Sequence, residues 1–405
     1  MKGLNLSGGA IGFCVAAIVL GGCGGSQQPV GAPATNAVAP AQVLARRPTE
    51  AEWERWRSMM LQVPNPGHGC RKAIYPETQW RELRCEKGER ITHMPANAGI
   101  SHMQAYLKPL GIHPQVGGDA YFAVPSGGHI TAGLGSFVTV KNIASEGSVG
   151  GTDSDYDGAN YYSLILATNG FKASGMCPNP NCIGWQEFYF DNQGNTSGND
   201  GRLQIEYWLL NFAPCASRTC TDSCPSGWQG VHRGSSVNPE DCSTWSDETD
   251  VQSYAIANGL RYFRLGGASE SRPGGSGSDY ATLDVYGGPS PQLYQQDGSN
   301  EFPALSDFWH TAEFGVYGMC CGSEAFFTGD PTIAVHLGVT TVNNAQTTEC
   351  PRGIKNGFAT IGESNNLKLM PTPLQWPKRN WPAIVFTESN PSKPPKPNCA
   401  TIAAQ

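Results

Sequence analysis

The chain has 405 residues, a formal net charge of −7 and only 15% charged residues, together with 50 glycines and 30 prolines. This composition is typical of a loop-rich, all-β extracellular protein. The charge balance is acidic and no basic run follows the extreme N-terminus, which excludes nucleic acid as an expected partner.

The first 22 residues predict an export signal. Lys2 supplies positive charge, and the apolar run Ile11–Leu20 is too short to span a bilayer as a resident helix. The run leads into LGGC at residues 20–23, which resembles the lipobox of a bacterial lipoprotein. That resemblance implies cleavage before Cys23 and acylation of its thiol. The alternative is a plain secretory signal peptide that contains a cysteine.

Residues 23–47 are rich in Gly, Pro, Ala and Gln and predict a lipidated, flexible linker. Gly24, rather than an aspartate, follows the cysteine, which favours sorting to the outer membrane in a Gram-negative cell. We therefore expect an exported protein, anchored by lipid to an outer membrane or cell surface. Residues 48–118 are expected to form an N-terminal helical and loop segment, and residues 119–405 a β-sandwich domain.

One helix is expected, over Pro48–Val63. Thr49 followed by Glu52 is a capping-box pattern. The apolar side chains fall on one helical face at i, i+3 and i+7: Trp53, Trp56 and Met60. Two interpretations stay open, because this helix could dock on the main body or belong to a segment that covers a cleft.

From about residue 119 the pattern changes to short, aromatic and β-branched runs separated by Gly, Asn, Asp, Ser and Pro. The expected fold class is all-β, an antiparallel β-sandwich or jelly roll of the concanavalin-like kind, preceded by the short helix and loop segment. The expected strands are Ile130–Val140, Tyr161–Ala167, Ile183–Phe190, Leu203–Phe212, Leu260–Leu265, Tyr280–Tyr286, Ala312–Tyr317, Thr332–Val342 and Ala383–Thr387.

The chain has 14 cysteines, and 12 remain once Cys14 of the signal and Cys23 are set aside. An even number in an exported chain favours disulfides over metal ligands. The expected pairs are Cys70–Cys85, Cys177–Cys182, Cys224–Cys242 and Cys350–Cys399. The pairing of the others stays open: Cys215, Cys220, Cys320 and Cys321.

The stretch Asp153-Ser-Asp155-Tyr-Asp157-Gly158 reads DxDxDG, the front of a calcium-binding loop. Carboxylates at alternate positions can face one Ca²⁺ ion, and the glycine permits a sharp turn. The twelfth position of a complete loop of this kind is Leu164, not a glutamate. A Ca²⁺ site and a simple solvated acidic loop are both compatible with the pattern.

Two expected strands carry polar residues suited to acid–base chemistry. In GWQEFYF (Gly184–Phe190), Gln186 shares a face with the two phenylalanines, while Glu187 shares the other face with a Trp and a Tyr. In Thr311–Tyr317, Glu313 projects from a face of Thr, Gly and Tyr, and the apolar residues project from the other. A desolvated carboxyl suits a general base or acid in mildly acidic conditions, and an amide can donate to an oxyanion.

Gly184–Phe190 and Trp309–Phe327 resemble the active-site strands of glutamic peptidases, the eqolisin-like β-sandwich endopeptidases. The resemblance implies that Glu313 activates water and that Gln186 stabilises the oxyanion. The plant neprosin-type peptidases, which use two glutamates on a related sandwich, are a second parallel. On that version the second acid is Glu206 or Glu187. Either version implies an acid-active endopeptidase with a protein or peptide substrate and no required cofactor.

Three other interpretations stay open. Glu313 could be a solvated strand residue opposite a Lys or Arg. Glu206 and Glu313 could form the carboxylate pair of a polysaccharide hydrolase. The chain could also be a non-catalytic, lectin-like lipoprotein that binds glycan or protein through aromatic residues, with Ca²⁺ in the acidic loop. Its contact residues would then be Tyr189, Tyr207, Trp208 and Trp228.

Overall fold

The computed structural model describes most of the chain between residues 47 and 389, and every structural statement below concerns these residues. The described residues are 47–63, 69–88, 122–125, 129–150, 157–168, 170–173, 175–180, 182–193, 201–214, 224–231, 239–252, 259–269, 278–287, 290–298, 301–302, 305–319, 323–341, 348–349, 366–369, 374–375 and 383–389.

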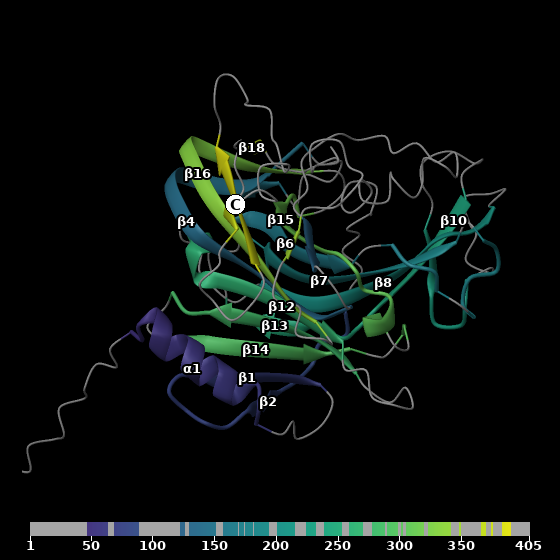
Figure 1. Cartoon of the computed structure of the whole chain (residues 1–405), viewed down its shortest axis with the longest axis horizontal. Coiled ribbons are helices and arrows are strands. Elements are labelled where there is room, and N and C mark those ends of the chain that lie inside the picture. Colours follow the sequence, from purple (N-terminus) through teal and green to yellow (C-terminus); the bar gives the residue numbers. More distant parts are fainter. Residues whose placement is uncertain are drawn as a thin grey trace, which may run out of the picture. The chain divides into compact units, whose positions relative to one another are not determined.

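The described strands form two antiparallel sheets, one of eleven strands and one of nine (Figure 1). The expected all-β sandwich with a small N-terminal helix is confirmed. Expected strands mostly start where predicted and often run further. Ala312–Tyr317 has the expected bounds, whereas the strand expected to end at Val140 continues to Val149.

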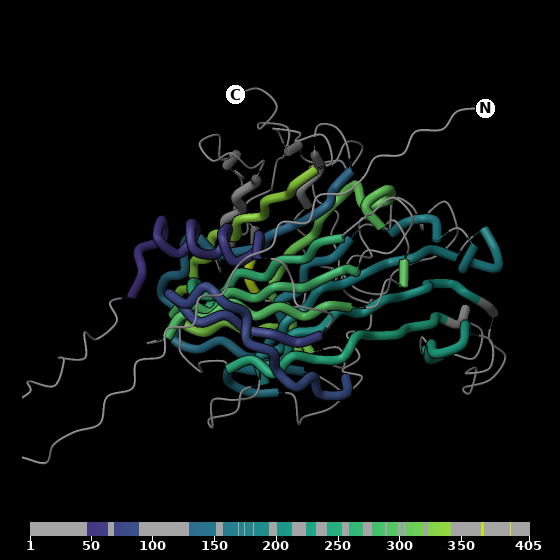
Figure 2. The backbone as a smooth tube through the Cα atoms, turned by 90° about the horizontal axis from the view of Figure 1, so that it is seen from below, coloured from purple at the N-terminus to yellow at the C-terminus, as the bar shows by residue number. Residues whose placement is uncertain are grey.

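The eleven-stranded sheet runs β18-β20-β16-β4-β12-β13-β14-β1-β2, with β19 paired to β20 and β5 to β4. Its longest strands, β4 and β16, lie side by side over most of their length and can be followed in Figure 2. The strands are β1 (Cys70–Ile74), β2 (Arg81–Leu83), β4 (Ile130–Val149), β5 (Gly158–Ala159), β12 (Phe263–Ser269), β13 (Asp279–Val285), β14 (Gln292–Asp297), β16 (Glu324–Thr341), β18 (Lys368–Leu369), β19 (Leu374–Gln375) and β20 (Ala383–Ser389).

The nine-stranded sheet runs β17-β3-β15-β6-β7-β8-β10-β9, with β11 paired to β8. Two 3-10 turns accompany the sheets, η3 (Gly259–Tyr262) and η4 (Leu305–Asp307), and η3 replaces the first half of the strand expected over Leu260–Leu265. The strands are β3 (Phe122–Pro125), β6 (Tyr161–Thr168), β7 (Ile183–Gln193), β8 (Gly201–Pro214), β9 (Gln229–Val231), β10 (Pro239–Trp245), β11 (Thr249–Val251), β15 (Ala312–Tyr317) and β17 (Thr348–Glu349).

The main core lies between the two sheets. Alternate residues of facing strands bury apolar side chains there, as the two-residue period of a strand requires. Aromatic rings join the layers, with Phe137 of β4 5.6 Å from Phe314 of β15 and Phe190 of β7 5.2 Å from Phe263 of β12, measured between ring centroids. This core fixes which face of each strand points outward.

Two glycines of the eleven-stranded sheet receive aromatic rings from the opposite sheet. A Cβ on Gly135 would lie 2.1 Å from the ring of Phe314, and a Cβ on Gly267 would lie 2.2 Å from the ring of Phe188. Both contacts are far below van der Waals distance, so only glycine leaves room for these rings. Phe314 directly follows Glu313 and Phe188 directly follows Glu187, so these contacts fix the strands that carry the two carboxyl groups.

Helix α1 (Glu50–Met60) begins at the expected cap. Thr49 and Glu52 form the capping box, and the apolar stripe of the helix is buried. The helix lies beside β13, β14 and β1 (Figure 1). Its Trp53 donates to Asp284 of β13, a residue that points away from the main core. The helix therefore docks on the outer face of the eleven-stranded sheet.

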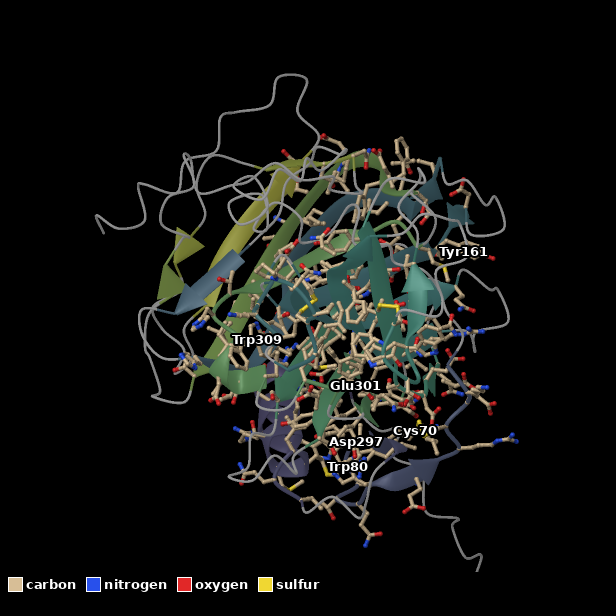
Figure 3. The ribbon with its side chains drawn as sticks, turned by 90° about the vertical axis from the view of Figure 1, so that its right-hand side faces the viewer. Cys70, Trp80, Tyr161, Asp297, Glu301 and Trp309 are labelled. Atoms are coloured by element: carbon tan, nitrogen blue, oxygen red, sulfur yellow. A yellow bond between two sulfur atoms is a disulfide. The ribbon has the colours of Figure 1, made fainter. Side chains whose placement is uncertain are left out.

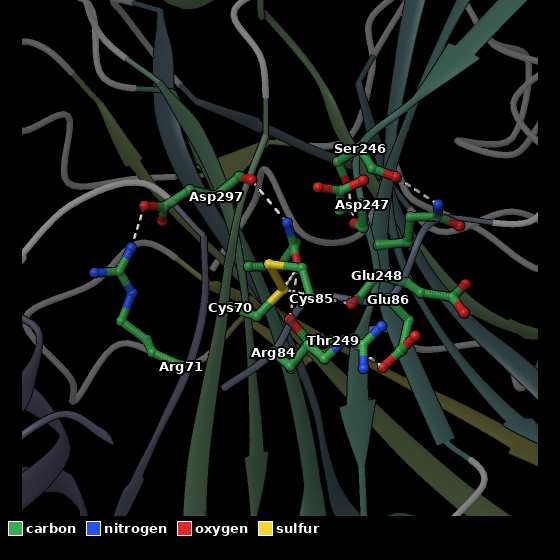
Figure 4. Close-up of a disulfide and its surroundings, with 12 residues drawn as sticks. Cys70, Arg71, Arg84, Cys85, Glu86, Ser246, Asp247, Glu248, Thr249 and Asp297 are labelled. Carbon is green, nitrogen blue, oxygen red and sulfur yellow. Dashed lines mark hydrogen bonds and ion pairs between the residues drawn. A yellow bond between two sulfur atoms is a disulfide. The ribbon is translucent and has the colours of Figure 1, made fainter. Parts of the chain in front are cut away.

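Residues 69–88 extend that same sheet. β1 pairs with β14, β2 pairs with β1, and the Cys70–Cys85 disulfide closes the loop between them. Figure 3 places Cys70 near Asp297, as the pairing of β1 with β14 requires. The close-up in Figure 4 shows the Arg71–Asp297 ion pair, whose two side chains are each only 3% exposed, beside this disulfide. The N-terminal segment is thus built into the sheet by backbone pairing and buried charge.

Three expected disulfides are present: Cys70–Cys85, Cys177–Cys182 and Cys224–Cys242. Cys350–Cys399 and the four cysteines without an assigned partner lie outside the described residues. Within the described ranges, no helix has the length and apolar character needed to cross a membrane.

Candidate active site

Three glutamates form a row across the nine-stranded sheet. Glu313 of β15 is paired with Ala167 of β6, Ala167 with Glu187 of β7, and Glu187 with Glu206 of β8. Directly paired residues of antiparallel strands project from the same face. Glu187, Glu206 and Glu313, which we call the glutamate row, therefore share one face.

That face points away from the main core. The residues next to the row along each strand, such as Phe314, Phe188 and Ile205, belong to the core between the sheets. The row instead accompanies a second apolar cluster on the outer face, made of Ile165, Ala167, Ile183, Trp185, Tyr189, Trp208, Leu210, Val231 and Tyr317. All three glutamates are nonetheless shielded from solvent, with exposed fractions of 0% for Glu187, 1% for Glu206 and 2% for Glu313. The idea of a solvated strand glutamate at position 313 is wrong.

The spacing of the row suits a shared ligand. Neighbouring strands lie roughly 4.8 Å apart, so the backbones of Glu187 and Glu313, with β6 between them, are separated by roughly 10 Å. The residue between them is Ala167, a small side chain that is itself buried in the outer apolar cluster. Glu187 and Glu206 occupy directly paired positions, whereas Glu206 and Glu313 are three strands apart.

Electrostatics keep a proton within the row. Burial is the largest cause that raises the pKa of Glu187 well above its ordinary value of 4.5, and the charges of Glu206, Glu313 and Asp191 raise it further. Within the described structure, neither carboxyl oxygen of Glu187 has a hydrogen-bond partner. Glu187 therefore favours its neutral, protonated form over a pH range in which an exposed glutamate is charged.

Glu313 has a different environment. The hydroxyl of Tyr317, four residues further along β15, donates a hydrogen bond to Glu313 Oε1 at 3.2 Å. A donor of this kind favours the charged form of a carboxyl group. The carboxyl groups of Glu187 and Glu313 thus differ in hydrogen bonding, since only that of Glu313 accepts the Tyr317 hydroxyl.

Gln186, the expected oxyanion partner of Glu313, does not lie near it. Gln186 projects from the opposite face of β7, where its Nε2 donates to Asp279 Oδ2 of β13 at 2.9 Å. The pairing of the strands explains the separation, because Gln186 and Phe188 alternate with Glu187 and so face the main core. Gln186 links the two sheets, whereas Glu187 shares the face of Glu313, with β6 between them.

Burial raises the pKa of Asp279 from 3.8 to about 7, although hydrogen bonds from Gln186 and Ser269 lower it. Between these pH values Asp279 ionises in the unfolded chain but keeps its proton in the folded protein. The stability that protonated Asp279 contributes is therefore fully present below about pH 4 and is lost as the pH rises toward 7. We expect Asp279→Asn to reduce the fall in the free energy of unfolding between pH 4 and pH 7 by about 3 kcal/mol, from about 1.4 kcal/mol for each pKa unit. Chemical denaturation of both proteins across this range measures it, and parallel curves would contradict the assignment.

Other predicted functional residues are placed less favourably or lie outside the described residues. Cys23, Asp153 and Asp155 belong to the latter group, so lipidation and a Ca²⁺ site stay predictions; Asp157 is half-buried. Among described side chains, no group of three or more His, Cys, Asp and Glu is arranged to hold a metal ion. The expected glycan-contact residues are at most 8% exposed, so they offer no stacking surface: Tyr189, Tyr207, Trp208 and Trp228.

A cavity of about 570 Å³ lies on the outer face of the other sheet, next to α1. Its lining includes Glu54, Arg264 and a Ser136–His336 hydrogen bond of 3.2 Å. None of the glutamate row lines it, so α1 borders a cavity without covering the candidate site.

No protein-family model matches the chain, and the searches of curated proteins and solved structures gave no match either.

Proposed function

We propose that this chain is a glutamic-type endopeptidase that hydrolyses peptide bonds at acidic pH, with Glu313 and Glu187 as its acid–base pair. The observation that supports it best is the buried Glu313–Ala167–Glu187 arrangement on one face of the sheet. Two carboxyl groups that flank a small residue can hold a water and a peptide carbonyl between them. This arrangement favours the two-glutamate, neprosin-type version over the version that pairs a glutamine with a glutamate.

In the proposed mechanism one carboxyl group of the pair accepts a proton and the other donates one. The charged member of the pair takes a proton from water, whose oxygen attacks the peptide carbonyl carbon. The protonated member donates to the carbonyl oxygen, which neutralises the charge that develops there. Breakdown of the tetrahedral intermediate returns that proton, breaks the C–N bond and protonates the leaving amine.

The proposed setting is the outside of a bacterial membrane, with the protein held through acylated Cys23 and acting on protein or peptide substrates. The three disulfides within the described residues are in keeping with an oxidising compartment. The glutamate row is shielded from solvent, so the proposed reaction requires this face of the sheet to become accessible to a substrate.

The test compares the purified mature protein with Glu313→Gln. Each protein is preincubated at pH 4 to 5 and then mixed with a denatured protein substrate, and the products are followed by mass spectrometry. We expect cleavage that resists pepstatin, and a loss of about 10³-fold in kcat/KM in the variant, because general acid–base catalysis contributes typically 10²–10⁴-fold.

Glu324→Gln is the matched control. Glu324 lies at the start of β16, is exposed, and is absent from the row, so its replacement leaves cleavage unchanged. Absence of cleavage across the acid range, or equal cleavage by wild type and Glu313→Gln, would refute the proposed function.

A further inference from the structure

Tyr317 reaches Glu313 by lying across a glycine. The two residues are separated on the same face of β15 by Gly315 alone. A Cβ on Gly315 would lie 2.9 Å from the Tyr317 hydroxyl oxygen and 3.0 Å from its ring, closer than real Cβ atoms ordinarily approach. The missing side chain lets the tyrosine ring fold back along the strand and place its hydroxyl 3.2 Å from Glu313 Oε1.

This contact distinguishes Glu313 from Glu187. Glu313 accepts a hydrogen bond from a hydroxyl that is itself buried, since Tyr317 is 5% exposed. Glu187 is fully buried, has no hydrogen bond to either carboxyl oxygen in the described structure, and lies next to the carboxyl group of Glu206. A hydrogen-bond donor favours a charged carboxylate, whereas burial next to another acid favours the neutral acid.

We propose that Tyr317 is a positioning residue that keeps Glu313 charged and oriented, so that Glu313 acts as the general base and Glu187 carries the proton as the general acid. This inference rests on the proposed function and specifies which glutamate is the base and which is the acid. Glu313 takes the proton of the attacking water, and Glu187 gives its proton to the carbonyl oxygen. When the C–N bond breaks, Glu313 passes its proton to the amine, and Glu187 recovers one from the hydroxyl of the intermediate.

Other ionisable groups on the same face bear on this balance. Glu206 of β8 lies directly beside Glu187 of β7. Further along the same two strands, Asp191 of β7 is paired with Arg202 of β8. Arg202 also lies 3.5 Å from Glu248. These charges act on both Glu187 and Glu313, whereas the Tyr317 hydroxyl contacts Glu313. Replacing the tyrosine therefore tests whether this hydrogen bond makes the two glutamates differ in protonation.

The first readout is independent of activity. Protein labelled with ¹³C at the glutamate side-chain carboxyl carbon is titrated by NMR, and the signals are assigned with Glu187→Gln, Glu206→Gln and Glu313→Gln. At pH 5.5 we expect Glu313 to be ionised and Glu187 to be protonated. Tyr317→Phe should move the titration midpoint of Glu313 upward by about one pH unit, the scale of one lost hydrogen bond.

Tyr162→Phe is the matched control. Tyr162 is a buried tyrosine of β6 that projects into the main core, on the face of the sheet opposite to Glu313. Its replacement leaves the Glu313 midpoint in place. A Glu313 that is protonated together with Glu187 at pH 5.5, or an unchanged midpoint in Tyr317→Phe, would overturn the inference.

The second readout is the pH profile of kcat/KM. Tyr317→Phe should lower kcat about 10-fold with little change in KM and move the acidic limb of the profile to higher pH, because that limb reports the free enzyme's base. If Glu313→Gln and Glu187→Gln both abolish cleavage while Tyr317→Phe keeps the wild-type profile, the inference fails and the proposed function stands. If wild type does not cleave, the proposed function fails, and the NMR titration still decides the protonation states.

Discussion

Glu187→Gln should make the protein more stable and at the same time inactive. The carboxyl group of Glu187 is fully buried, has no hydrogen-bond partner in the described structure, and lies directly beside Glu206 in the row that also holds Glu313. A glutamine has the same shape and cannot become charged. Its introduction therefore removes the cost of burying an ionisable group that the fold does not compensate.

The gain in stability of Glu187→Gln should grow as the pH rises. The pKa of Glu187 is raised above its ordinary value of 4.5 by burial first and then by neighbouring carboxylates. Below that value both the folded and unfolded chains carry the proton, and above it the unfolded chain gains stability by ionising. Wild type should therefore lose up to about 1.4 kcal/mol of stability through this group for each pH unit above 4.5, and the variant should not.

Thermal unfolding of wild type and Glu187→Gln at pH 4, 6 and 8 measures this difference. The melting temperatures should nearly coincide at pH 4, and the variant should melt higher at pH 8, while its kcat/KM at pH 4 to 5 falls about 10³-fold. Glu324→Gln, which replaces an exposed glutamate, serves as control for both measurements. A variant that is less stable than wild type at pH 8 would contradict the described environment of Glu187.

The fold class, the capped helix and three disulfides were predictable from the sequence because each depends on local patterns. Alternating apolar residues predict the central strands, and Thr49 with Glu52 predicts the start of α1. β14 was missed since its sequence, QLYQQD, carries almost no apolar alternation. Its residues are buried all the same, because β1 and β13 pair with it on both sides.

The identity of the partner of Glu313 was not predictable from local patterns. The two-residue period of GWQEFYF correctly separates the faces of Gln186 and Glu187, but it gives no sign of which face is shared with β15. That depends on β6 lying between β15 and β7 and on the register that sets Ala167 between two glutamates. Sheet order and register are non-local, so local patterns could not show that Gln186 and Glu313 lie on opposite faces of the sheet.

The buried ion pair under α1 carries the second large expected effect. Arg57 Nε lies 2.8 Å from Asp284 Oδ1, and the two side chains are 6% and 0% exposed. Trp53 donates to the other oxygen of Asp284 at 3.0 Å. We expect Arg57→Ala to lower the free energy of unfolding by about 3 kcal/mol, because buried Asp284 loses its hydrogen-bonded counter-ion and keeps only the charge of Arg264 nearby.

Urea denaturation at pH 7 measures this effect, with Arg55→Ala as the matched control. Arg55 lies on the same helix but is exposed, so its replacement should change the free energy of unfolding by less than about 0.5 kcal/mol. The double variant Arg57→Ala with Asp284→Asn should recover part of the loss, since the buried carboxylate charge is then absent. Because α1 docks on the outer face of the opposite sheet, folded Arg57→Ala should keep the wild-type pH profile of cleavage. A loss below about 1 kcal/mol would mean that α1 is not held to the sheet by this pair.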